Sequence, residues 1–150
     1  MADMREKLQE LGERRKRLEP GGDEAAIEKQ HGRGKLTAWE RIERLFDAGT
    51  FQEIGIWTQP MKTGFDIDSR ELPRDSVITG CGKIHGRDVY AYAHDFTVLA
   101  GTQSTIQNSK VARAMEKAME EGIPLVGMVD SGAIRIHDLF GRAGFKVPVR

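Results

Sequence analysis

A short apolar run that ends abruptly in a polar, glycine-containing turn constrains this chain more than any other stretch. Residues 123–129 read I-P-L-V-G-M-V, and Asp130, Ser131 and Gly132 follow directly. An uninterrupted apolar run of this length is typical of a strand that is buried on both faces of a parallel sheet. Pro124 near its start and the valines within it favour a strand over a buried helix. The sequence therefore predicts an α/β fold in which a central strand ends at this turn.

The turn after this strand is the first candidate functional site. Open α/β sheets bind their ligands outside the carboxyl ends of their strands. If a helix begins just after Gly132, its first backbone N–H groups have no partner within the helix. Such groups stabilise an oxygen atom that gains negative charge during a reaction. The turn thus predicts chemistry that is performed by backbone amides.

The residues before the turn predict strands and a helix that lead into it. Strands are expected at 76–84 and 88–95, and the H-G-R sequence at 85–87 is a hairpin signal between them. Residues 104–121 place apolar side chains at helical spacing, so a helix is expected there. The order strand, helix, strand makes a βαβ unit, and the hairpin that leads into it completes one ββα step.

The first half of the chain is charged and predicts shorter elements. Residues 1–22 are expected to form an amino-terminal helix and a linker, and Asp23 is expected to cap a short helix that ends at Gln30. A strand is expected at 51–57 and a long loop at 58–74. The first helix is either solvated or packed on a partner subunit, because its apolar stripe is narrow. That stripe comprises Met4, Leu8, Leu11 and Leu18.

A basic loop precedes a second helix start. Thr37 and Glu40 have the spacing of a capping box, so a helix is expected to begin there. Arg33, Gly34 and Lys35 lie just before it. Two cations on either side of a glycine, next to a helix amino terminus, suit a phosphate group. The alternative is a solvated basic loop without a ligand.

Composition excludes several classes of function. The 23 basic and 23 acidic residues give a net charge of zero, which offers no electrostatic reason to expect nucleic acid or an acidic membrane as a partner. Cys81 is the only cysteine, so no internal disulfide or cysteine metal cluster is expected, and the reducing cytoplasm is the expected location. The histidines lack metal-ligand spacing, so no bound metal is expected. No run is apolar enough to span a bilayer, and the amino terminus resembles neither a signal nor a transit peptide.

Ser131 raises the alternative of a serine hydrolase. A nucleophile elbow has glycine two residues before the serine, where this chain has Val129. His85, His94 and His137 are candidate bases, but nothing in the sequence brings any of them close to Ser131. The backbone-amide interpretation is therefore favoured.

Several stretches in this order together resemble the amino-terminal part of the carboxyltransferase subunits of biotin-dependent acyl-CoA carboxylases and decarboxylases. K-Q-H-G-R-G-K-L-T-A-W-E-R-I and F-D-A-G-T-F-Q-E resemble the start of the family's domain. V-I-T-G-C-G-K-I-H-G-R-D-V-Y resembles its first hairpin, and H-D-F-T-V-L-A-G-T-Q-S the strand and turn before its first long helix. P-L-V-G-M-V-D-S-G-A-I-R-I resembles its Asp-Ser-Gly-Gly-Ala-Arg-Ile segment. The resemblance covers about residues 28–136.

This resemblance implies a fold, a substrate and partners. It implies a partial crotonase-like domain over residues 23–150, built from ββα units and preceded by amino-terminal helices. It implies an acyl-CoA substrate, and transfer of a carboxyl group between its α-carbon and a biotin. The biotin would be carried by a biotin carboxyl carrier protein, and an oligomer is expected. The resemblance does not separate carboxylase from decarboxylase, nor one acyl group from another.

The resemblance also implies site residues. By position, the backbone N–H groups of Gly132 and Ala133 would hold the thioester oxygen as it becomes an enolate. Arg135 either contacts CoA or forms a structural ion pair. The residues expected to contact CoA are Arg33, Lys35, Gly101 and Arg135.

The chain departs from the family pattern in two residues and in length. Ala133 stands where the family has a second glycine, and Ile134 where it has a small residue. The familiar sequence stops near Ile136, whereas family members complete this domain and add a second one that binds biotin. We therefore expect an amino-terminal piece that has no activity without the remaining carboxyltransferase parts. The alternative is a truncated, non-catalytic remnant or interaction module.

Overall fold

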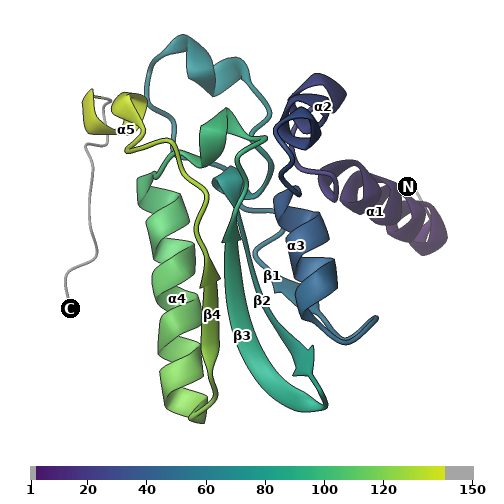
Figure 1. The fold of residues 1–150 in the computed structure, drawn as a ribbon. Coiled ribbons are helices and arrows are strands. Elements are labelled where there is room, and N and C mark those ends of the chain that lie inside the picture. The colour runs from purple at the N-terminus through teal and green to yellow at the C-terminus, as the bar shows by residue number, and fades with distance from the viewer. Residues whose placement is uncertain (1–2, 141–150) are drawn as a thin grey trace.

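A mixed four-stranded sheet forms the centre of the molecule (Figure 1). The computed structural model describes residues 3–140. The sheet order is β1-β2-β3-β4, in which the first three strands are antiparallel and β4 runs parallel to β3. The strands are β1 (Gln52–Ile54), β2 (Val77–Ile84), β3 (Arg87–His94) and β4 (Leu125–Met128).

The β2–β3 hairpin confirms the expected turn. Ile84 pairs with Arg87, and the two residues between them, His85 and Gly86, have φ values of 49° and 76°. Two left-handed residues are typical of a type I′ turn. The Asp47 carboxylate accepts hydrogen bonds from both of their N–H groups, at 3.1 and 2.8 Å. These bonds hold the pKa of Asp47 below its ordinary value.

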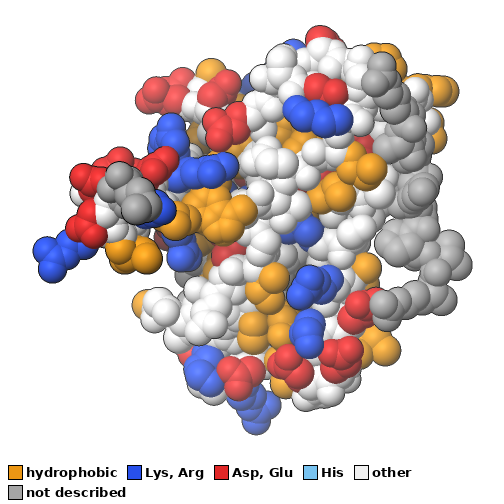
Figure 2. Space-filling model, turned by 180° about the vertical axis from the view of Figure 1, so that it is seen from behind, with side chains coloured by type: hydrophobic (Ala, Val, Ile, Leu, Met, Phe, Trp, Pro, Cys, Tyr) orange, Lys and Arg blue, Asp and Glu red, His pale blue; other side chains and the backbone are white. Residues whose placement is uncertain are grey.

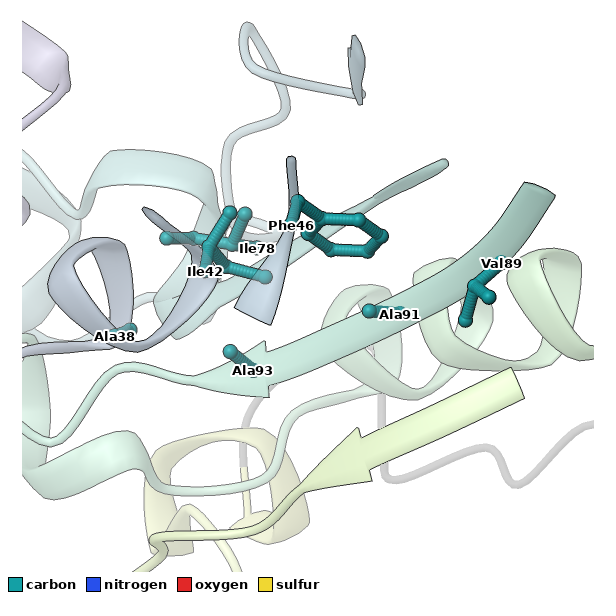
Figure 3. Close-up of a cluster of buried hydrophobic side chains, with 7 residues drawn as sticks. All are labelled: Ala38, Ile42, Phe46, Ile78, Val89, Ala91 and Ala93. Atoms are coloured by element: carbon teal, nitrogen blue, oxygen red, sulfur yellow. The ribbon is translucent and has the colours of Figure 1, made fainter. Parts of the chain in front are cut away.

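Helix α3 (Ala38–Leu45) covers one face of the sheet. Thr37 and Glu40 form the expected capping box at its start. The face of β3 that contacts this helix carries alternate residues of the strand. Figure 3 shows the packed side chains, which are Ala38, Ile42, Phe46, Ile78, Val89, Ala91 and Ala93.

Helix α4 (Thr105–Glu121) lies on the opposite face and completes the βαβ unit. Ser104 caps its first turn by accepting a hydrogen bond from the Gln107 N–H. Gly122, with a φ of 68°, ends it in a left-handed conformation. The Tyr90 hydroxyl donates to Glu121 at 3.0 Å, which ties β3 to the end of the helix. The helix predicted at residues 104–121 is confirmed.

The amino-terminal helices lie beside this core. Helix α1 (Met4–Leu18) extends from the body of the molecule, and α2 (Glu24–Gly32) is capped by Asp23 as expected (Figure 1). Leu18 is the buried residue of α1. The rest of its apolar stripe, Met4, Leu8 and Leu11, is exposed by 67%, 62% and 49%.

The long loop contains two short 3₁₀ turns, η1 (Asp66–Ser69) and η2 (Pro73–Ser76). Three consecutive residues, Arg74, Asp75 and Ser76, have left-handed φ values of 58°, 51° and 60°. Such a conformation costs a side-chain-bearing residue about 1 kcal/mol or more, so the surrounding contacts must hold it. The buried Arg74 guanidinium pairs with Glu53 and donates to the Leu18 carbonyl oxygen.

Three expectations from the sequence are corrected. The strand predicted at 51–57 is only Gln52–Ile54, because Gly55 turns the chain with a φ of 78°. β4 is not buried on both faces: none of its four residues is buried, and Gly127 is exposed. It is also the outermost strand of the described sheet. The last helix, α5 (Ile136–Phe140), begins later than the position just after Gly132. Among residues 3–140, no helix combines the length and the apolar character needed to cross a membrane.

Lys110 of α4 makes a testable contribution to stability. Its ammonium donates to the carbonyl oxygens of Arg74 and Val77, at 2.9 and 2.6 Å. Burial lowers the pKa of Lys110 from 10.5 to about 8. Between these two pH values the unfolded chain holds a proton that the folded chain has released, so stability rises with pH.

We expect the charged Lys110 ammonium to lower the free energy of unfolding by about 3 kcal/mol below pH 8. This loss should disappear as the pH approaches 10.5. Urea unfolding of the wild type and of Lys110→Met between pH 7 and 10 measures it. The difference in unfolding free energy between the two proteins should favour the wild type increasingly as the pH rises. A constant difference would show that the Lys110 ammonium is not perturbed.

Candidate functional site

The D-S-G turn lies where β4 ends, beside the loop that follows β3. That loop contains the short turn η3 (Leu99–Gly101). The N–H of Gly132 donates to the carbonyl oxygen of Ala100 at 2.8 Å. The two loops are therefore joined directly, at the edge of the sheet where the sequence placed the site.

The chain stays extended for several residues after the turn. Gln103 N–H donates to the Ala133 carbonyl at 2.9 Å, and Arg135 N–H donates to the Gln103 carbonyl at 2.7 Å. These two bonds form an isolated parallel bridge between Gln103 and Ile134. Because of this bridge, the next helix begins only at Ile136. On the other side of the bridge, Gly132 lies next to Ala100.

This geometry corrects the expected role of Gly132. Its N–H is already hydrogen-bonded, so it does not point freely at a ligand. The Ala133 N–H has no partner among residues 3–140, and the residue is exposed. Ala133 is thus the donor of the expected pair that the structure leaves available.

Ala100 is a second available donor, which the sequence reasoning missed. Its N–H makes no hydrogen bond within the described part, and its φ is 53°. A Cβ at Gly132 would lie 3.3 Å from the Ala100 Cβ, so the two loops are in contact. The rule that pointed to the end of β4 applies equally to the end of β3, which is the signal that could have found Ala100.

Asp130 connects the turn to the basic loop. Its carboxylate accepts hydrogen bonds from Lys35 and from Gln30, both at 3.0 Å. Burial acts to raise the pKa of Asp130, but these bonds outweigh it and hold the pKa below its ordinary value. Lys35, one of the residues that the sequence suggested for CoA binding, therefore lies next to the turn.

The basic loop also borders a hollow that reaches Ala100. The Arg33 guanidinium and the Lys35 ammonium each lie 5.6 Å from the centre of the Phe96 ring. Cations at this distance from an aromatic face are attracted to it. The hollow has a volume of about 210 Å³. Its lining residues are Ala26, Lys29, Gln30, Arg33, Phe96, Thr97 and Ala100.

Gly101 has a packing role at this site. Its φ is 61°, and a Cβ there would lie 2.4 Å from the Asp130 carbonyl oxygen. A side chain at this position would therefore push the turn away from the β3 loop. The contact of Gly101 with CoA that the sequence suggested remains a prediction.

Arg135 takes the structural alternative that the sequence left open. Its side chain is buried and pairs with the buried Asp75, which also accepts a hydrogen bond from Ser104. The expected contact of Arg135 with CoA is therefore corrected, because the guanidinium is enclosed and already paired.

The alternative chemistries find no support in the described residues. Ser131 Oγ donates to the Ala133 carbonyl at 3.4 Å, and none of the hydrogen bonds within residues 3–140 joins it to a histidine. His94 is buried, and burial lowers its pKa below the ordinary value. Its Nδ1 has no hydrogen-bond partner. Within the same range, no three His, Cys, Asp or Glu side chains form a group that could hold a metal ion.

Comparison with known proteins identifies the family. Residues 29–144 match the family described as the carboxyl transferase domain. The chain belongs to this carboxyl transferase family.

The relatives of this carboxyl transferase chain are much longer proteins. It is 43% identical over 132 residues to the methylmalonyl-CoA decarboxylase subunit alpha of Propionigenium modestum. The matched region is 88% of this chain and 26% of that relative. It is 41% identical over 135 residues to the propionyl-CoA carboxylase beta chain of Roseobacter denitrificans, covering 90% of the chain and 26% of the relative. The chain thus spans about a quarter of the length of these relatives.

A solved structure agrees with the fold of this carboxyl transferase chain. Transcarboxylase 12S, described as a hexamer with methylmalonyl-coenzyme A bound, superposes with a TM-score of 0.88 at 40% identity. The match covers 91% of this chain and 27% of that one. The partial crotonase-like fold expected from the sequence is confirmed. The proposed boundary between residues 22 and 23 is not tested and stays a prediction.

Proposed function

We propose that this chain is the amino-terminal piece of a carboxyltransferase subunit that acts on an acyl-CoA. The reaction would move a carboxyl group between the α-carbon of the thioester and a biotin on a biotin carboxyl carrier protein. The observation that carries this proposal is the unbonded N–H of Ala133, an exposed residue. The preceding residue, Gly132, is hydrogen-bonded to Ala100, which lines the hollow together with Lys29 and Arg33. The family and the substrates named for its relatives support the same chemistry.

The amides would act on the charge that develops in the reaction. Loss of the carboxyl group from the α-carbon leaves an electron pair, which delocalises onto the thioester oxygen as an enolate. The N–H groups of Ala133 and Ala100 come from two loops in contact, so they are the candidate donors to this oxygen. One preorganised donor typically stabilises such a transition state by about 3 kcal/mol. No titratable side chain is needed for this step.

The basic residues would hold the nucleotide end of the substrate. Lys29 and Arg33 line the hollow, and Lys35 lies over the same aromatic ring as Arg33. Arginine and lysine bind phosphate through charge-assisted hydrogen bonds. Lys35 is shared with Asp130, so a phosphate would compete with that carboxylate for its ammonium.

The remaining parts of the enzyme are proposed as partners. Because the chain spans about a quarter of its relatives, we propose that further carboxyltransferase parts complete the site and that the assembly is oligomeric. A cytoplasmic location fits the single cysteine, Cys81. One observation favours the alternative of a non-catalytic remnant, namely that the Gly132 N–H is bonded to Ala100 rather than available.

Calorimetric titration with CoA tests the nucleotide site. We expect the double variant Arg33→Ala, Lys35→Ala to weaken CoA binding about thirtyfold, because each of the two lost phosphate contacts removes roughly 1 kcal/mol. The control is Lys83→Ala, Arg87→Ala, which removes the same charge at the exposed hairpin end far along β2 and β3. Equal weakening in both variants would mean that only net charge matters, and the site would be elsewhere.

Decarboxylation of methylmalonyl-CoA with free biotin tests the proposed need for other parts. We expect no turnover by the chain alone and turnover after the missing carboxyltransferase parts are added. Turnover by the chain alone would contradict the proposal that it is incomplete. CoA binding without turnover in any mixture would favour the non-catalytic alternative.

A further inference from the structure

A second hollow lies on the other side of the sheet, between β1, β2 and α4. It has a volume of about 230 Å³. Its lining residues come from four segments: the end of β1, the start of the long loop, β2 and one side of α4. Figure 2 views the molecule from behind and shows Lys and Arg side chains lying among hydrophobic ones on this face. None of the residues that form the candidate carboxyltransferase site lines this hollow.

Three basic residues of α4 line it. Lys110, Arg113 and Lys117 recur at helical spacing, so they lie along one side of the helix. Lys117 is paired with Glu120 at 3.1 Å. Arg113 is exposed and forms no ion pair with any residue from 3 to 140. One full positive charge at the rim of the hollow is thus uncompensated.

Lys110 adds a second positive charge to the lining of the hollow. Its ammonium donates to two backbone carbonyl oxygens, which leaves one of its three hydrogens without a partner among the described residues. Both acceptors are neutral, so no carboxylate is bonded to this ammonium. Glu53 and Asp75 favour the charged form of Lys110 without bonding to it, and Arg74 opposes them. An anion that accepts the third hydrogen would add the direct ion pair that this ammonium lacks.

The rest of the lining is apolar or uncharged. Ile54, Ile106 and Ala114 form apolar walls, and none of the lining residues is acidic. At about 30 Å³ for each water in the liquid, the volume holds roughly seven or eight non-hydrogen atoms. A CoA nucleotide is much larger than this. The space suits a small molecule with a hydrocarbon body and one anionic end.

We propose that this hollow between β2 and α4 binds a short-chain organic carboxylate. Its carboxylate lies between Arg113 and Lys110, and its hydrocarbon chain lies against Ile54, Ile106 and Ala114. Arginine suits this role, because its guanidinium can bind both carboxylate oxygens at once. The proposal is independent of the carboxyltransferase function, because the two sites share no residue.

The pH dependence of binding follows from the groups around Lys110. Burial lowers the pKa of this ammonium to about 8, so Lys110 loses its positive charge as the pH rises past that value. Affinity should therefore fall as the pH rises from 7 to 9. The charged groups that face Lys110 from other elements are Glu53 of β1 and Arg74 and Asp75 of η2.

NMR titration of the full chain with hexanoate tests the site. We expect saturable shifts of the Gly55, Thr58 and Thr79 amide signals, with a dissociation constant on the order of millimolar for so small a ligand. Arg113→Gln should weaken binding about fivefold or more, since it removes one charged hydrogen-bonding partner. The matched control is Arg44→Gln, which removes an exposed arginine from the opposite face of the sheet.

The outcomes separate the proposal from its alternatives. Hexanol, which lacks the charge, should bind at least tenfold more weakly than hexanoate. Equal binding of the two, equal effects of the two arginine variants, or no saturable shift would each overturn the proposal. Lys110→Met removes two backbone contacts and can affect folding, so the test rests on the exposed Arg113 instead. CoA should leave these signals unchanged.

Discussion

Replacing Asp75 by alanine should destabilise the fold by about 3–5 kcal/mol, the largest single effect that the structure suggests. Asp75 and Arg135 are both buried and form an ion pair. Removal of the carboxylate leaves the buried guanidinium with only the more distant carboxylate of Asp138, at 4.0 Å, as an opposite charge. A domain of this size has a total stability of about 5–15 kcal/mol, so a large part would be lost.

The position of this ion pair explains why the effect should reach the site. Arg135 follows the bridge between Gln103 and Ile134, and its N–H donates to Gln103. Asp75 also accepts from Ser104, the residue that caps α4. One carboxylate thus anchors both the start of α4 and the chain that presents Ala133. Loss of Asp75 should loosen both at once.

Asp88→Ala is the matched control for Asp75→Ala. Asp88 also forms an ion pair, with Lys83 at 2.8 Å, but both side chains are exposed. Exposed pairs contribute about 1 kcal/mol or less, so this change should have a small effect. Urea unfolding, followed by circular dichroism, measures both variants. Similar losses for the two would contradict the importance assigned to the buried pair.

Local signals in the sequence predicted most of the elements. The capping box at Thr37 and Glu40, the hairpin turn at Gly86 and the terminal glycine at Gly122 each have a local physical cause, and all are found. Such signals act within a few residues. They need no knowledge of the rest of the fold.

The errors arose where partners distant in sequence decide the outcome. Gly132 is bonded because Gln103, which lies in another loop, pairs with the chain beyond the turn. Arg135 is buried because Asp75 lies beneath it, although 60 residues separate the two. β4 is an edge strand of the described sheet, which its apolar sequence alone does not reveal. The local sequence carries no information about these pairings.

Replacing Gly101 by alanine is expected to have the second-largest effect, about 3 kcal/mol of stability together with weaker CoA binding. Two costs add at this position. Alanine is strained at a φ of 61°, and its Cβ would lie 2.4 Å from the Asp130 carbonyl oxygen. That oxygen belongs to the backbone, so the turn itself must move. Movement of Asp130 would also disturb its bond to Lys35.

Gly86→Ala separates the two costs. Gly86 has a φ of 76°, but a Cβ there meets no atom within 4 Å, so only the strain of about 1 kcal/mol applies. Urea unfolding and calorimetric titration with CoA should show a small loss of stability and unchanged CoA binding for this variant. Equal losses of stability in the two variants would mean that the close approach of Gly101 to Asp130 is not required. Normal CoA binding by a destabilised Gly101→Ala would mean that the turn and the basic loop are not coupled through Asp130.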